Sequence, residues 1–356
     1  GDITSQGSSI NLEAAQGGLT LANLNALSSI SLRSGNGAIS LTSAHADTDG
    51  ANGGNLFIDA NGVGSAITAS GAMSGSSITL NADDDVSVDR LDSLNNIFVT
   101  AVGNILASGN WTAGAATSFD EIDVQSLSGG TITLRDLSAG DLFIGDFSSS
   151  HSTGDIQLGT LNVSDDILVE TDNGNLSITG INSVGGRVDL HTVTGSIQVG
   201  GNIDSLTGSI DIDAGNGDLV LGNLRAVSGI FLRTDNGDIQ VAGANADSDQ
   251  INGGNLSFTA TGLGNSALPA AIRASGLLSG KWPAVVTSYD AESRTCEVSI
   301  PGVTDGAEGG MIAEIEYPIG DKSRHETMTE IEILPGDKAW VEFIQGDPRY
   351  PLITGW

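Results

Sequence analysis

The stretch that decides the fold runs from 167 to 199 and reads ILVETDNGNLSITGINSVGGRVDLHTVTGSIQV. Short apolar-x-apolar triplets recur in it, at Ile167-x-Val169, Leu176-x-Ile178, Val188-x-Leu190 and Ile197-x-Val199. Alternation with a period of two is typical of short strands with one buried face. Between the triplets lie turn formers such as Asp172-Asn173-Gly174-Asn175, which tolerate the positive φ of tight corners.

The same rhythm extends over most of the chain, from Ile10-x-Leu12 and Leu19-x-Leu21 to Ile230-x-Leu232 and Ile239-x-Val241. A hairpin sheet would also place Asn-Gly between strands. The long, nearly constant period instead favours a chain that winds into coils of about 20 residues, each burying its apolar face only against its neighbours. We therefore expect a single-chain right-handed parallel β-helix, or β-solenoid, of about a dozen coils whose strands pair in parallel.

A longer repeat is superimposed on the coils. Residues 19–62 match residues 219–262 at a constant offset of 200, with about half of the positions identical. The match resumes after a five-residue shift and ends at Gly280, where Lys281-Trp282-Pro283 begins. Because the second copy is cut in mid-coil, the sequence indicates a join between unrelated segments, by recombination or by design.

Composition changes at the same place. All three lysines and all three tyrosines lie after residue 280, and Glu replaces Asp as the main acidic residue there. We place a domain boundary between 1–280 and 281–356 and expect the second domain to be a small five-stranded OB-type barrel. The segments expected to form its strands are Trp282–Tyr289, Thr295–Ile300, Met311–Tyr317, Glu330–Leu334 and Ala339–Ile344, with a closing segment Leu352–Gly355.

Charge and composition exclude several classes of function. A net charge of -31 repels nucleic acid and anionic membranes, and the C-terminal domain carries six Lys or Arg against fourteen Asp or Glu. The single cysteine, Cys296, allows no disulfide within the chain. No apolar stretch reaches the ~18 residues of a membrane-spanning helix. We expect no nucleic-acid partner and no membrane span.

The Gly-x-Ile/Leu-x-Leu and Asn-Gly-x-Ile rhythm of residues 1–280 resembles exoproteins of the filamentous-haemagglutinin type, which are secreted by the two-partner route. That resemblance implies a fragment of a large adhesin, located outside the cell or on its surface, whose partner is a host-cell receptor or glycan. We expect a non-enzymatic structural or adhesive rod.

Residues 281–356 resemble the OB domain of contractile-tail baseplate spike proteins, the phage baseplate assembly protein V family. The matching residues are Ala284-Val285-Val286-Thr287, Leu334-Pro335-Gly336-Asp337 and Gly346-Asp347-Pro348-Arg349-Tyr350-Pro351. The resemblance implies binding to a baseplate hub or to itself as a homotrimer, so that the barrel caps or trimerises the solenoid. In the spike family a trimeric needle follows the OB domain, whereas here a solenoid precedes it. The alternative function is a natural phage tail spike or fibre, located in a virion tail.

Candidate sites are few. The long loops 42–55 and 242–255 could supply oxygen ligands to Ca²⁺ through Asp47, Asp49 and Asn52 and through Asp247, Asp249 and Asn252, although a solvated loop is the more frequent outcome of such sequences. No other cofactor is expected. A carbohydrate-active β-helix enzyme is the remaining alternative, because such enzymes use paired carboxylates. The region before residue 280 has one tryptophan and no tyrosine or lysine to line a sugar-binding groove, so we expect no enzyme.

Overall fold

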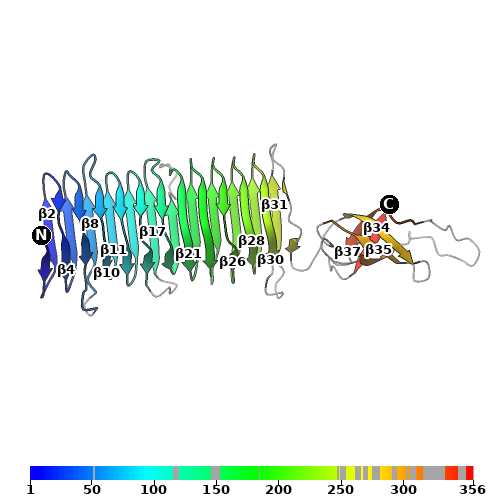
Figure 1. Cartoon of the computed structure of the whole chain (residues 1–356), viewed down its shortest axis with the longest axis horizontal. Coiled ribbons are helices and arrows are strands. Elements are labelled where there is room, and N and C mark those ends of the chain that lie inside the picture. Colours follow the sequence, from blue (N-terminus) through cyan, green and yellow to red (C-terminus); the bar gives the residue numbers. More distant parts are fainter. Residues whose placement is uncertain are drawn as a thin grey trace, which may run out of the picture.

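The computed structural model is all-β, and its described residues contain no helix. It comprises a parallel β-solenoid of about 11 turns with coils of about 21 residues, followed by a closed barrel (Figure 1). The structure describes the chain except for residues 51–52, 115–119, 146–152, 184, 247, 249–253, 261–265, 268–271, 275–280, 291–294, 302–303, 305–309, 316–332, 344–349 and 356. The predicted all-β class, the solenoid and the five-stranded barrel are confirmed.

Strands of nearly uniform length, five or six residues each, form a 12-stranded parallel sheet, called here the 12-strand sheet. Its members are β2 (Ile10–Ala14), β5 (Ile30–Ser34), β8 (Leu56–Ala60), β11 (Ile78–Ala82), β14 (Ile97–Ala101), β17 (Glu121–Ser126), β20 (Asp141–Gly145), β22 (Ile167–Thr171), β24 (Val188–Thr192), β27 (Ser209–Ala214), β29 (Gly229–Thr234) and β31 (Asn255–Ala260). Each strand pairs with the strand one coil before and one coil after it, as when Ile167 pairs with Val188 and Val188 with Ile210.

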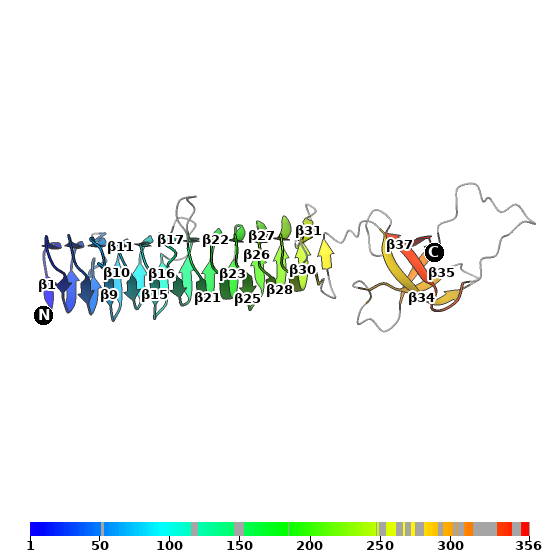
Figure 2. The same ribbon diagram turned by 90° about the horizontal axis from the view of Figure 1, so that it is seen from above.

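The opposite wall of the solenoid is a 21-stranded sheet, whose strands stack along the same axis (Figure 2). Each coil contributes two short strands to it, or one longer strand that bends. Its members are β1 (Ile3–Ser5), β3 (Leu19–Thr20), β4 (Asn23–Ala26), β6 (Ile39–Leu41), β7 (Ser43–His45), β9 (Ile67–Ala69), β10 (Met73–Gly75), β12 (Val86–Val88), β13 (Leu91–Ser93), β15 (Ile105–Ala107), β16 (Trp111–Ala113), β18 (Ile132–Leu134), β19 (Leu137–Ala139), β21 (Ile156–Val163), β23 (Leu176–Ser183), β25 (Ile197–Val199), β26 (Ile203–Ser205), β28 (Leu219–Ala226), β30 (Ile239–Ala246), β32 (Ser266–Ala267) and β33 (Ile272–Ala274).

The core is a column of aliphatic side chains between these two sheets. Both apolar members of each triplet point inward, as in β24, where Val188 and Leu190 are fully buried and Asp189 faces out. Because the side-chain direction alternates along a strand, this is the burial that a period of two requires. The large ring of Trp111 takes one aliphatic place in the column, and its Nε1 donates to the Asp89 carbonyl oxygen at 3.1 Å.

Buried hydroxyl groups at the ends of the strands form hydrogen bonds with backbone groups of the adjacent turns. Thr192, at the end of β24, is fully buried, and its Oγ1 donates to the Gly174 carbonyl oxygen at 2.9 Å and accepts from the Gly195 N–H at 3.0 Å. Thr234 repeats both bonds two coils further on, with Gly217 and Gly237. These bonds satisfy turn carbonyls that the solenoid removes from water.

Glycines stack at the same corner. A Cβ atom added to Gly195 would collide with the carbonyl oxygen of Gly174, and one added to Gly217 would collide with that of Gly195. The recurring Asn-Gly and Thr-Gly sequences are therefore needed because successive coils approach each other through their backbones.

Equivalent residues pair between coils in the two copies of the long repeat. Ile30 pairs with Leu56, and Ile230 pairs with Leu256. In the first copy, the long loop 42–55 leads back to the 12-strand sheet, whereas much of 242–255 lies outside the described residues.

The C-terminal barrel contains β34 (Trp282–Asp290), β35 (Thr295–Ser299), β36 (Met311–Ile315), β37 (Lys338–Phe343) and β38 (Pro351–Gly355), closed in the order β34-β35-β36-β38-β37. Only the pairing of β36 with β38 is parallel. This is the OB-like barrel that the sequence predicts. The predicted closing segment is itself the fifth strand. The expected strand Glu330–Leu334 lies largely outside the described residues, and its Ile333 and Leu334 belong to no strand.

The glycine stack generates a matched pair of variants. Gly195→Ala forces a methyl group against the backbone of the coil before it, so we expect it to lower the free energy of unfolding by about 1–3 kcal/mol, as overpacking does. Gly180→Ala serves as the control, because a Cβ there meets nothing within 4 Å. Both are measured by chemical denaturation, and an equal effect of the two substitutions would refute the role of backbone contact.

Candidate functional site

The long loop of the first repeat carries the first predicted calcium ligands. Asp47 is 8% exposed and adopts a φ of 55°, and its Oδ2 accepts a hydrogen bond from Ser76 Oγ at 3.1 Å. Asp49 is exposed, and Asn52 lies outside the described residues. The Asp47 carboxylate thus accepts a hydrogen bond that ties the loop to the neighbouring coil.

The second predicted set, Asp247, Asp249 and Asn252, lies entirely outside the described residues. In the part of the chain that the structure does describe, no group of three or more His, Cys, Asp or Glu is placed to hold a metal ion. The calcium sites stay predictions.

Many other acidic residues sit at the corner before a strand of the 21-strand sheet, where they link consecutive coils. Asp155 Oδ1 accepts from the Asn175 N–H at 2.7 Å, Asn175 Oδ1 from the Ser196 N–H at 3.0 Å, and Ser196 Oγ from the Asp218 N–H at 3.0 Å. Asp218 Oδ1 then accepts from the Asp238 N–H at 2.8 Å. Short polar side chains at this position therefore support the fold, and aspartates such as Asp155 and Asp218 serve there as hydrogen-bond acceptors.

A charged ladder on the outer face of the 12-strand sheet is the main cluster of titratable groups. Glu170, His191, Asp213 and Arg233 are successive partners in β22, β24, β27 and β29. His191 Nδ1 lies 3.4 Å from Glu170 Oε1, and Arg233 lies 3.7 Å from Asp213 Oδ2. Acidic and basic side chains thus alternate along the ladder, and Arg233 offsets part of its negative charge.

Beside it, Asp189 of β24 and Asp211 of β27 are direct partners, so two like charges stack. Burial raises the pKa of the Asp189 carboxyl, while Arg187, 3.6 Å away, acts in the opposite direction. Burial likewise raises the pKa of Asp213, opposed by Arg233, and one oxygen of the Asp213 carboxylate is buried without a hydrogen-bond partner. The folded protein therefore holds these carboxylates less readily in their charged form than the unfolded chain does.

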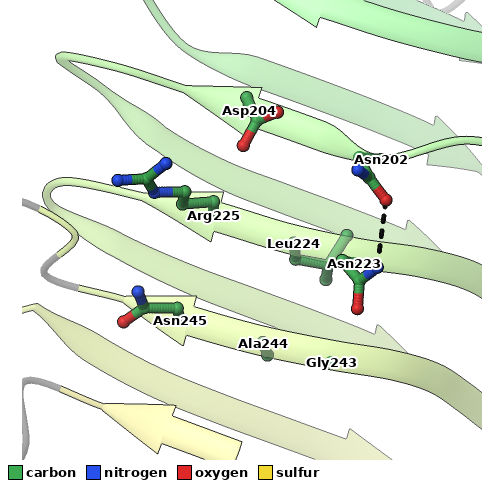
Figure 3. A pocket seen from close by; sticks show the side chains of 8 residues that line it. All are labelled: Asn202, Asp204, Asn223, Leu224, Arg225, Gly243, Ala244 and Asn245. Carbon is green, nitrogen blue, oxygen red and sulfur yellow. Dashed lines mark hydrogen bonds between the residues drawn. The ribbon is translucent and has the colours of Figure 1, made fainter.

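A shallow hollow of about 400 Å³ lies on the other wall, over β26, β28 and β30 (Figure 3). Arg225 extends between the strands that carry Asp204 and Asn245, and Asn223 Nδ2 donates to Asn202 Oδ1 at 3.1 Å. Its lining of amides, one cation and one carboxylate can donate to and accept from a polar ligand, but its open shape encloses little of one.

Sequence reasoning missed the charged ladder. His191, Glu170 and Asp213 occupy the same place in successive coils, so aligning the coils by their apolar triplets would have brought them together. Cys296 is buried in the barrel core, and burial raises the pKa of its thiol, which disfavours the reactive thiolate. Within the described ranges no helix is long and apolar enough to span a membrane.

Comparison with known proteins adds no assignment, because no family model, no curated protein and no solved structure matches the chain.

The half-buried Asp189 carboxyl beside the charged ladder predicts a pH effect on stability. A carboxyl whose pKa is raised in the folded state loses its stabilising contribution as the pH rises through that folded value. Asp189→Asn imitates the neutral form, so we expect it to stabilise the protein at pH 7 and to lose this advantage as the pH falls toward ~4. The control is Asp172→Asn, which removes the same charge from a turn.

Both variants are compared with the parent by urea denaturation, since a pI of about 4.1 favours aggregation on heating in acid. An advantage of Asp189→Asn that is the same at both pH values would contradict the burial argument.

Proposed function

We propose that this chain is a non-enzymatic structural and adhesive rod of the filamentous-haemagglutinin type, exposed outside the cell and binding a host receptor or glycan. The observation that carries the proposal is the uninterrupted parallel ladder of the 12-strand sheet, which builds one stiff element from a repeated coil. Such a fold holds binding groups at a distance from an anchor and repeats them along its length.

The arrangement of charges supports binding more than catalysis. The Glu170 and Asp213 acids of the charged ladder each lie beside a basic side chain. The neighbouring Asp189 lies beside Arg187 and is the ladder partner of Asp211. General acid and base catalysis instead needs two groups held on either side of a bound substrate. The two kinds of function can be separated directly.

The purified chain is expected to bind host cells or immobilised cell-surface glycans and to release no products from a broad panel of polysaccharides. Binding is measured by surface retention and cleavage by chromatography of the soluble fraction. Polysaccharide shortening that Glu170→Gln or Asp213→Asn abolishes would overturn the proposal in favour of a carbohydrate-active enzyme.

For the barrel we propose a capping and trimerising role. Large apolar side chains on its surface support this, with Trp340 46% and Val285 39% exposed on neighbouring strands β37 and β34. With Pro283 and Pro301 they line one hollow of about 260 Å³. An exposed apolar patch of this kind is typical of a surface that is covered by another chain.

The trimer is tested by light scattering coupled to size-exclusion chromatography. The parent is expected to have the mass of three chains, and Trp340→Asp is expected to shift it to one chain by placing a charge in the interface. Ile312→Asp is the control, because Ile312 is 68% exposed on β36, which pairs with neither β34 nor β37. A monomeric parent would end the trimer proposal.

A phage tail spike or fibre is the second candidate, favoured by the OB-like strand order of the barrel. In that setting the barrel would bind a baseplate hub and the rod would be the distal element of a virion tail. Electron micrographs that show the barrel seated on isolated baseplates would favour this candidate over a cell-surface adhesin.

A further inference from the structure

Three phenylalanines form a regular row on the outer face of the 12-strand sheet. Phe57 of β8 is the ladder partner of Thr79, which is the partner of Phe98 of β14. Phe98 in turn is the partner of Asp123, and Asp123 of Phe143 in β20. All three rings point outward and are half-buried. An aromatic ring therefore appears at every second coil, with a polar residue between.

The spacing of the row follows from the sheet. Parallel strands lie about 4.8 Å apart, so rings two coils apart are separated by about 9.6 Å along the axis. That is close to the length of one disaccharide unit in an extended β-1,4-linked glycan. In such a chain the C–H groups on the faces of the sugar rings form apolar surfaces that pack on aromatic rings.

Hydrogen-bonding side chains lie beside the row. Asp59, Asn81, Thr100 and Gln125 are ladder partners in the outward column next to it. Gln125 Nε2 donates to the Asp123 carboxylate at 3.1 Å, and the Arg33 guanidinium lies over the Phe57 ring, 5.2 Å from its centroid. Apolar rings flanked by amides, a hydroxyl and a guanidinium offer both contacts that a sugar ring needs, one to its face and one to its hydroxyl groups.

We propose that the row Phe57, Phe98 and Phe143 is a binding surface for an extended, neutral β-1,4-linked polysaccharide, aligned with the solenoid axis. This inference rests on the proposed adhesive function and names the class of ligand. The ligand is neutral because the chain carries a net charge of -31, and Asp59 and Asp123 would repel sulfated or uronic glycans. A second copy of the chain fits the row less well, because a dry interface would bury the Asp123 carboxylate between two rings.

The experiment measures retention of the full chain on microcrystalline cellulose and on chitin, with heparin-agarose and starch as the anionic and α-linked comparisons. The parent is expected to bind one or both β-1,4-linked polymers and neither comparison. Phe57→Ser, Phe98→Ser and Phe143→Ser combined are expected to weaken retention by about tenfold or more. Phe98→Leu, which keeps an apolar side chain but has no ring face, is expected to weaken it in part.

Phe231→Ser is the matched control, because Phe231 occupies the same outward column in β29 but stands alone between Asp211 and Ser257. It is expected to bind as the parent does. Circular dichroism and urea denaturation establish that each variant is folded.

Three outcomes would overturn the inference. They are a parent that binds no β-1,4-linked polymer, a triple variant that binds as well as the parent, and self-association that the triple variant abolishes. If the parent adheres to cells but binds neither polymer, the polysaccharide inference is wrong and the adhesive proposal stands. If the parent neither adheres to cells nor binds a polymer, both are wrong.

Discussion

The backbone hydrogen bonds between consecutive coils are the interaction on which the rest of this structure depends. A single coil buries almost nothing, because Val188 and Leu190 find apolar neighbours only in the coils before and after them. The backbone N–H and C=O groups of a coil likewise depend on its neighbours, because they form hydrogen bonds along the axis with the adjacent coils and not within the coil. Stability therefore accumulates through contacts between neighbours, and every corner must let two backbones approach closely. Gly195 against Gly174 meets that demand sterically, and Thr192 meets it with hydrogen bonds.

This constraint also explains the arrangement of charge. A residue type that suits one coil at a given position suits the next, so acids, amides and hydroxyls line up in columns. The series from Asp155 through Asn175 and Ser196 to Asp218 uses side-chain oxygens to accept N–H groups that the corner leaves free. In the Glu170–His191–Asp213–Arg233 series, acidic and basic side chains alternate. Part of the acidity of this chain thus serves to build its corners, and the net negative charge limits the ligands that the outer surface can accept.

The sequence predicted the features that repeat and missed those that depend on register. Apolar triplets recur from coil to coil, with turn formers between them, so the solenoid and its buried positions could be read directly. The partnership of Glu170 with His191 becomes visible only when successive coils are aligned by their triplets, because each of the two residues directly follows its triplet. In the barrel, where nothing repeats, strand order had to come from resemblance, and Leu352–Gly355 was expected only to close the barrel although it forms the strand between β36 and β37. The calcium hypothesis rested on loop composition, which does not say that Asp47 turns inward to Ser76 while Asp49 faces solvent.

In a parallel ladder, residues that repeat from coil to coil in the sequence lie at regular intervals along the solenoid axis. This spacing affects which ligands the rod can bind. A globular site gathers unlike residues around one ligand, whereas successive coils present like residues at multiples of the strand spacing. The ligand best matched to such a surface is a polymer with its own repeating unit. Each added coil then adds a contact of the same kind, and little further entropy is lost because the polymer is already oriented. Isolated residues of the same type, such as Phe231 on the same face as the Phe57 row, gain nothing from this effect. The row and the single ring therefore differ in their capacity to bind a polymer, although all four rings face outward on the same sheet.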